Sequence, residues 1–152
     1  MNDFNEILKK IQKYCAFSER CEFEVMTKLK TYKTDQPTAV KIIKSLRDDN
    51  FINDERYATS FASGKLNYNK WGRIKISYEL KAKKIPDQII DKALSKIEED
   101  KYNAILEKLL KAKYQTIIDE DQYKRNAKLV SYAVSKGFET ELVWKIINKL
   151  KN

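Results

Sequence analysis

The 152-residue sequence contains no histidine and only three glycines, two cysteines and two prolines. Without histidine the chain lacks the commonest general base, the Ser-His and Cys-His nucleophile pairs and most zinc-binding patterns. The glycines, Gly64, Gly72 and Gly137, are too far apart for a loop that cradles phosphate groups. We therefore predict a protein that is not an enzyme and that has no catalytic residue, no metal site and no cofactor.

Long apolar runs are also missing. No run approaches the roughly 20 residues that span a bilayer, and the N-terminal "MNDFNEILKK" lacks a signal-peptide pattern, so we expect a cytoplasmic protein. Cys15 and Cys21 could form a disulfide, but cytoplasmic thiols are usually reduced. We expect both cysteines to be ordinary packing residues.

Positive charge is abundant: 31 Lys and Arg residues face 22 Asp and Glu residues, which gives a net charge of +9. Residues 65–84 hold seven cations and one carboxylate, so two thirds of the net charge lies there. This concentration favours an anionic partner, usually nucleic acid. The alternative is a solvated helical surface, because helix geometry spreads these cations over several sides. The candidate binding residues are Lys65, Lys70, Arg73, Lys75, Lys81, Lys83 and Lys84, followed by Lys124, Arg125, Lys128 and Lys136.

Apolar residues follow the i, i+3, i+4, i+7 spacing of helices through most of the chain, and no strand pattern occurs. We predict an all-α protein of about nine helices. The helix-start signals after the first helix are Ser18, Pro37, Asn53-Asp54, Gly72, Pro86, the "EED" at 98–100, Asp119 and Thr140, and Gly137 ends the eighth helix.

Two segments, 73–94 and 126–147, align at a constant offset of 53 residues. Ile76 then corresponds to Leu129, and Leu80 to Ala133. The segment 21–43 follows a similar plan with a longer turn. We interpret the pattern as three tandem three-helix repeats in one continuous domain, at residues 1–50, 51–98 and 99–152. The alternative is that unrelated helical hairpins look alike under a loose alignment.

The fifth predicted helix has apolar residues on two sides. Ile74 and Tyr78 lie nearly opposite Ile76 and Leu80, at about 100° per residue. We expect both pairs to be packed, one within its repeat and the other against a neighbouring repeat.

At the start of this helix, Trp71 is expected to pack against the next helix, with base stacking as the alternative. Gly72 suits a helix-start position where a side chain would be crowded.

These segments, in this order, resemble the RecX family of regulators of the recombinase RecA. "SERCEFEVMTKL" resembles the helix of the family's first repeat, and "LRDDNFINDERYATSF" resembles its junction between repeats. "WGRIKISYELKAKKI" matches the G-x-x-[RK]-I-x-x-E-L helix of the second repeat, and "KLVSYAVSKGFETELVWKII" matches the Gly-Phe ending of the third. The resemblance covers about residues 5–150. The residues that carry it, interpreted as structural, are Asp54, Glu55, Arg56, Tyr57, Trp71, Gly72, Glu79, Leu80, Gly137 and Phe138.

Two positions depart from the family pattern. The third repeat of the family usually carries a more basic stretch before its Gly-Phe, whereas this chain has "SKGF" at 135–138. The glycine of the second repeat is often followed by proline, and here Arg73 takes that place.

The resemblance implies an elongated, curved array of three-helix repeats without a catalytic centre. It implies a protein that binds the RecA filament and contacts single- or double-stranded DNA within it. We expect this protein to be a monomer. Such proteins usually inhibit the RecA ATPase and strand exchange, and thereby restrain recombination and the SOS response. The sequence leaves inhibition or stimulation open. The alternative function is a stand-alone DNA-binding protein of helix-turn-helix type, although no helix concentrates Arg, Asn and Gln as base readers do.

Overall fold

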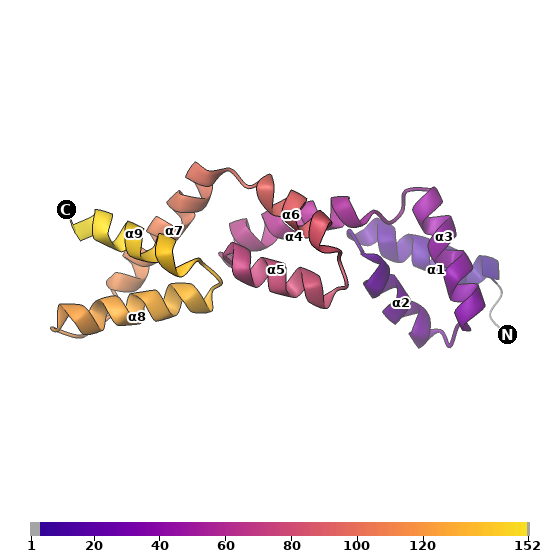
Figure 1. The fold of residues 1–152 in the computed structure, drawn as a ribbon. Helices are drawn as coiled ribbons and strands as arrows, with labels where there is room; N and C mark the ends of the chain where they lie inside the picture. Colours follow the sequence, from indigo (N-terminus) through magenta and orange to yellow (C-terminus); the bar gives the residue numbers. More distant parts are fainter. Residues whose placement is uncertain (1–3, 152) are drawn as a thin grey trace.

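In the computed structural model, residues 4–151 are described, and they form nine α-helices without a strand. The helices are α1 (Phe4–Phe17), α2 (Glu22–Thr31), α3 (Gln36–Asp48), α4 (Asp54–Asn69), α5 (Arg73–Ala82), α6 (Asp87–Ser95), α7 (Glu99–Tyr114), α8 (Gln122–Ser135) and α9 (Thr140–Lys151). They form an elongated row, with α1–α3 at one end and α7–α9 at the other (Figure 1). No helix in this part of the chain is both long and apolar enough to cross a bilayer.

Most helices begin at the residues that the sequence indicates, and two begin a few residues later. The side chain of Asn53 accepts a hydrogen bond from the Arg56 N–H at 2.9 Å and starts α4. Ser18 does not start α2, because Glu24 reaches back to the Cys21 N–H at 3.2 Å and fixes the start at Cys21. Ahead of α8, Asp119 accepts a hydrogen bond from the Asp121 N–H, and Asp121 is the cap.

The helices pack mainly within consecutive triplets, which we call unit 1 (α1–α3), unit 2 (α4–α6) and unit 3 (α7–α9). The second helix of each unit is followed by a residue with positive φ, at Lys33, Lys84 and Gly137. Ile76 and Leu129, which the offset of 53 residues equates, are both buried. The prediction of an all-α array of three-helix repeats is confirmed, whereas the boundaries at residues 50 and 98 stay a prediction.

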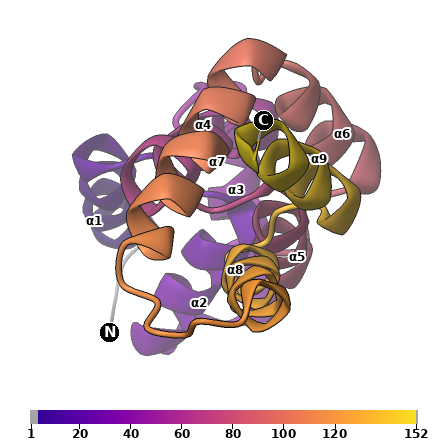
Figure 2. The same cartoon turned by 90° about the vertical axis from the view of Figure 1, so that its left-hand side faces the viewer.

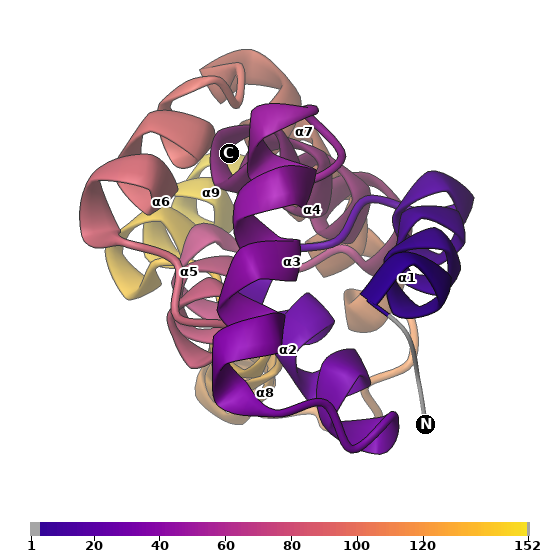
Figure 3. The same ribbon diagram turned by 90° about the vertical axis from the view of Figure 1, so that its right-hand side faces the viewer.

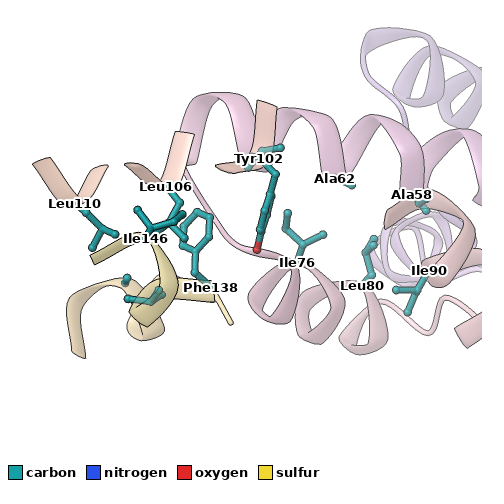
Figure 4. Close-up of a cluster of buried hydrophobic side chains, with 14 of the residues drawn as sticks. Ala58, Ala62, Ile76, Leu80, Ile90, Tyr102, Leu106, Leu110, Phe138 and Ile146 are labelled. Carbon is teal, nitrogen blue, oxygen red and sulfur yellow. The ribbon is translucent and has the colours of Figure 1, made fainter. Parts of the chain in front are cut away.

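The buried side chains form two clusters. One lies within unit 1 and includes Ile11 and Leu46. The other runs from unit 2 into unit 3, so that Ile76 of α5 lies near Tyr102 and Phe138 of unit 3 (Figure 4). Units 2 and 3 therefore share one core.

Both cysteines are buried and free. Cys15 packs in the core of unit 1, whereas Cys21, at the start of α2, belongs to the cluster of units 2 and 3. Burial raises the pKa of both thiols, which favours the uncharged, packed form.

The expectation that α5 packs on two sides is wrong. Ile76 and Leu80 are completely buried, but Ile74 is 57% exposed and Tyr78 is 71% exposed. The neighbouring units meet α5 near its ends: unit 3 contacts the backbone at Gly72, and Lys83 reaches unit 1. The long side of α5 opposite the core therefore stays uncovered.

Candidate nucleic-acid and protein interface

The most basic segment of the chain surrounds the turn between α4 and α5. Lys70 ends α4 with a left-handed backbone, φ 58°, and the Trp71 N–H donates to the Lys65 carbonyl at 3.1 Å. This closed turn directs the chain into α5, so cations from α4, from the turn and from α5 gather around Trp71.

Trp71 is half-buried and has aromatic and cationic neighbours. Its ring meets the Phe61 ring edge-on, with centroids 6.4 Å apart. The ammonium groups of Lys65 and Lys75 lie 4.8 and 4.6 Å from the Trp71 ring centroid. The electron-rich ring face attracts both cations and offsets part of their mutual repulsion. Trp71 thus packs against Phe61 and also stabilises the two neighbouring ammonium groups of Lys65 and Lys75.

Arg73 is engaged inside the molecule. Its guanidinium pairs with Glu99 at 2.5 Å and with Glu139 at 2.8 Å, and it lies 3.8 Å from the ring centroid of Tyr102. Both carboxylates and the ring belong to unit 3. The charge of Arg73 is therefore balanced at the contact between units 2 and 3.

Several other candidate cations also have partners. Lys83 of unit 2 pairs with Glu24 of unit 1 at 3.4 Å, and the ammonium of Lys136 donates to the Asn69 carbonyl at 2.8 Å. These two lysines therefore link neighbouring units.

The smaller basic cluster on α8 is partly neutralised. Lys128 pairs with Asp119 at 3.5 Å, and the guanidinium of Arg125 lies 4.8 Å from the Tyr114 ring centroid. Lys124 is exposed. The cluster contributes less free charge than the sequence suggests.

Among the candidate lysines at 65–84, five form no ion pair with any carboxylate of residues 4–150: Lys65, Lys70, Lys75, Lys81 and Lys84. All five come from α4, α5 and the turns beside them. We call this group the α4–α5 basic cluster. It is the main unpaired positive charge among the candidate residues.

The contact between units 2 and 3 brings two glycines together. The Gly72 N–H donates to the Lys136 carbonyl at 2.8 Å, and the Ile74 N–H donates to the Gly137 carbonyl at 3.0 Å. A Cβ on Gly72 would lie 2.3 Å from the Gly137 carbonyl oxygen. The backbone of unit 3 thus takes the place of a capping side chain at the start of α5.

Tyr102 completes this contact. Its hydroxyl accepts from the Arg73 N–H at 2.9 Å and donates to the carboxylate of Glu139. Burial is the main cause that raises the pKa of Tyr102, and the hydrogen bond to Glu139 raises it further. The hydroxyl therefore remains protonated and can donate. Figure 4 shows its oxygen directed toward the chain ahead of α5.

The contact between units 1 and 2 uses side chains. Arg56 pairs with Glu19 at 2.6 Å and also donates to the Asn50 carbonyl at 3.1 Å. Asp54 accepts from the Glu22 N–H at 3.5 Å, and burial raises the pKa of this carboxyl.

The remaining residues of the sequence motif lie within units. Glu55 pairs with Lys92 at 3.3 Å, and Tyr57 is buried against Phe61, with ring centroids 5.8 Å apart. Leu80 and Phe138 are completely buried, while Glu79 is half-buried on α5.

Two models of the RecX family match the chain. The model of the second three-helix domain matches residues 53–94, and the model of the third three-helix domain matches residues 99–147, together more than half of the chain. The chain belongs to the RecX family. The two matches fall on helices α4–α6 and α7–α9, and thus on units 2 and 3.

RecX proteins of known sequence and structure are similar over most of the chain. "Regulatory protein RecX" of Clostridium beijerinckii is 35% identical over 133 residues, which are 86% of this chain and 62% of that protein. "Regulatory protein RecX" of Clostridium tetani is 34% identical over 91% of this chain and 64% of that protein. The chain thus spans less than two thirds of the length of these RecX relatives. A crystal structure of RecX from Lactobacillus salivarius, 23% identical, superimposes with a TM-score of 0.85 over 97% of this chain and 96% of that one.

Sequence reasoning missed Glu19, Glu99, Tyr102 and Glu139 as residues of the contacts between units. Tyr102 fits the apolar spacing of α7, so the sequence gives no sign that its hydroxyl has two partners. Glu139 directly follows the Gly-Phe pair of the third repeat, and no local pattern indicates that it pairs with Arg73, which lies 66 residues away.

Proposed function

We propose that this protein regulates RecA by binding the RecA–DNA filament in the cytoplasm. In this proposal it is a non-catalytic monomer, with repeats at residues 1–50, 51–98 and 99–152. It restrains ATP hydrolysis, strand exchange and the SOS response. The observation that carries the proposal is the match of two RecX family models to units 2 and 3.

The shape supports binding along a filament. The second helices of the three units, α2, α5 and α8, lie toward the same edge of the row (Figures 1 and 2). A row of repeats offers successive units to a partner that is itself repetitive. One molecule can thus contact neighbouring filament subunits and hinder the changes in filament geometry that accompany ATP turnover.

The unpaired charge supports contact with DNA. The α4–α5 basic cluster gives attraction that does not depend on base sequence and that weakens as salt rises. Lys70, Lys81 and Lys84 are exposed. They are therefore the cations of this cluster most available to phosphate groups or to acidic surfaces of RecA.

The test is the single-strand-dependent ATPase of RecA, measured with increasing protein at moderate salt. We expect inhibition near stoichiometric amounts, together with co-sedimentation with the filament. The triple variant Lys70→Glu, Lys81→Glu, Lys84→Glu should lose both effects. Lys83 is left unchanged in this variant because it holds Glu24.

The matched control is Lys9→Glu, Lys13→Glu, Lys108→Glu, which makes the same change in net charge at exposed sites on α1 and α7. It should bind and inhibit like the unchanged protein. An ATPase that is unaffected by the unchanged protein would refute the proposal.

A stand-alone DNA-binding role is the second candidate, favoured by the unpaired basic cluster beside the helix–turn–helix formed by α5 and α6. It predicts a sequence-specific footprint on duplex DNA without RecA. The RecA-regulator proposal predicts no such footprint.

A further inference from the structure

The uncovered side of α5 carries two apolar side chains bordered by cations. Ile74 is 57% exposed and Tyr78 is 71% exposed. Around the helix, at about 100° per residue, these two side chains are adjacent, with Lys81 toward one side and Lys75 toward the other. We call these four residues the α5 stripe. The side chains of Ile74, Tyr78 and Lys81 are exposed, although the Ile74 N–H and the backbone of Lys75 lie against Gly137 of unit 3.

A shallow hollow adjoins the α5 stripe. Its volume is about 380 Å³, and it is lined by Ile74, Tyr78, Lys81, Ser77 and Leu94, with Arg73 and Glu139 at one side. Arg73 and Glu139 pair with each other at 2.8 Å, so their charges are satisfied. The surface around the hollow thus offers an aromatic ring, aliphatic carbon and an unpaired ammonium group.

We propose that the α5 stripe binds single-stranded DNA, with an unpaired base stacked on Tyr78 and phosphate groups at Lys75 and Lys81. An aromatic ring accepts any base, because every base has a flat face. In a duplex those faces are already stacked, so Tyr78 adds affinity only for an unpaired strand. The inference rests on the proposed function in one respect, that DNA is a ligand.

The charges favour DNA as the occupant of the α5 stripe. Neither Lys75 nor Lys81 pairs with a carboxylate of residues 4–150, and Lys84, in the turn after α5, has no such pair either. A polyanion with flat apolar groups is complementary to this arrangement. Binding to an acidic protein surface would use the lysines but would not need an exposed aromatic ring between them.

The neighbouring units also carry cations along the same edge. Lys30 of α2, which corresponds to Lys81 in the repeat alignment, is exposed and forms no ion pair with a carboxylate of residues 4–150. Lys128 of α8, which corresponds to Lys75, is exposed but pairs with Asp119 at 3.5 Å. Figure 3, like Figures 1 and 2, places α2 and α8 toward the same side of the row. A strand seated on α5 can therefore continue toward either neighbouring unit.

The test measures fluorescence anisotropy of a labelled oligo(dT) and of a duplex of equal length, without RecA, at one fixed moderate salt concentration. We expect the unchanged protein to prefer oligo(dT). Tyr78→Ala should weaken oligo(dT) binding about tenfold, equivalent to about 1.4 kcal/mol, and duplex binding less than about twofold. Tyr78→Phe, which keeps the ring, should bind like the unchanged protein.

The matched control is Tyr68→Ala, because Tyr68 is 87% exposed on α4 and lies outside the α5 stripe. It should leave oligo(dT) affinity unchanged. Lys81→Gln should weaken the binding of both oligonucleotides, and a separate series of salt concentrations should show a salt dependence lower by about one phosphate contact. Thermal unfolding followed by circular dichroism should be unchanged in all variants, since the altered side chains are largely in solvent.

Equal loss of oligo(dT) and duplex affinity in Tyr78→Ala would overturn the inference, as would no loss at all. A Tyr78→Ala variant that keeps oligo(dT) affinity but no longer co-sediments with RecA filaments would also overturn it, because the α5 stripe would then dock protein. The proposed function fails separately, if Tyr78-dependent oligo(dT) binding is present while the RecA ATPase is unaffected.

Discussion

The two contacts between neighbouring units are built differently. Units 2 and 3 share one core and meet backbone to backbone, with Gly72 against Gly137. Units 1 and 2 have largely separate cores, joined by side-chain pairs such as Arg56–Glu19, whose side chains are 36% and 33% exposed. Exposed ion pairs contribute little to stability, whereas a shared core must be opened to separate its halves. We infer that units 2 and 3 act as one body and that unit 1 adjusts its angle to them.

This difference bears on filament binding. The α4–α5 basic cluster lies on the body formed by units 2 and 3, where its geometry is fixed. Unit 1 is attached through contacts that can break and re-form at low cost. The comparison can be tested by weakening each contact in turn.

The largest effect is expected from Gly72→Ala. The added Cβ would lie 2.3 to 2.4 Å from the backbone of Gly137 and Phe138, and backbone cannot turn aside as a flexible side chain can. We expect the free energy of unfolding to fall by about 3 kcal/mol, measured by urea denaturation.

The control for this change is Gly64→Ala, the same substitution inside α4 at a position with nothing within 4 Å of the new Cβ. Because alanine is the better helix former, stability should rise by about 0.5–1 kcal/mol. Similar losses in both variants would contradict the tight backbone contact.

Tyr102→Phe should have the next largest effect. It removes the hydroxyl that accepts from the Arg73 N–H and donates to Glu139, and it leaves buried polar groups without their partner. The expected loss is about 2 kcal/mol by urea denaturation. Tyr68→Phe, at an 87% exposed site, is the control and should be neutral.

The pH dependence of this variant supplies a second measurement. Burial raises the pKa of Tyr102 in the folded protein, so the unfolded chain loses this proton first. The contribution of the Tyr102 hydroxyl to the free energy of unfolding is complete below the pKa of tyrosine in the unfolded chain, about 10. It declines as the pH rises above that value. The unchanged protein should therefore lose stability more steeply above about pH 10 than Tyr102→Phe does. Parallel profiles would exclude the buried hydroxyl as the source.

The fold was predictable because helical spacing and repeats are local signals. Ile76 and Leu129 could be equated from the sequence, and both are buried. The RecX resemblance also follows from ordered motifs such as "NDERYA" at 53–58. Each helix pattern or motif lies within one short segment, and the repeat is found by comparing such segments with one another.

The pairing state of the cations was not predictable. Arg73 and Glu139 lie 66 residues apart, and Lys83 and Glu24 lie 59 residues apart, so no local pattern links them. Seven cations at 65–84 thus looked equivalent, although two of them bridge units. The exposure of Tyr78 was missed because neighbouring units meet α5 near its ends rather than along its side.

The smallest effect is expected from Arg56→Ala, at the contact between units 1 and 2. The variant loses the pair with Glu19 and the hydrogen bonds to the carbonyls of Asn50 and Phe51. Because the Arg56–Glu19 pair is partly exposed, we expect a loss of only about 1 kcal/mol by urea denaturation. Small-angle X-ray scattering should nevertheless show a broader range of overall lengths, since unit 1 loses a constraint on its angle. Lys44→Ala, which breaks an exposed pair within α3, is the control and should leave the scattering unchanged. If Arg56→Ala lowers the free energy of unfolding as much as Gly72→Ala does and the scattering does not change, the contact between units 1 and 2 is as rigid as that between units 2 and 3. The comparison then fails.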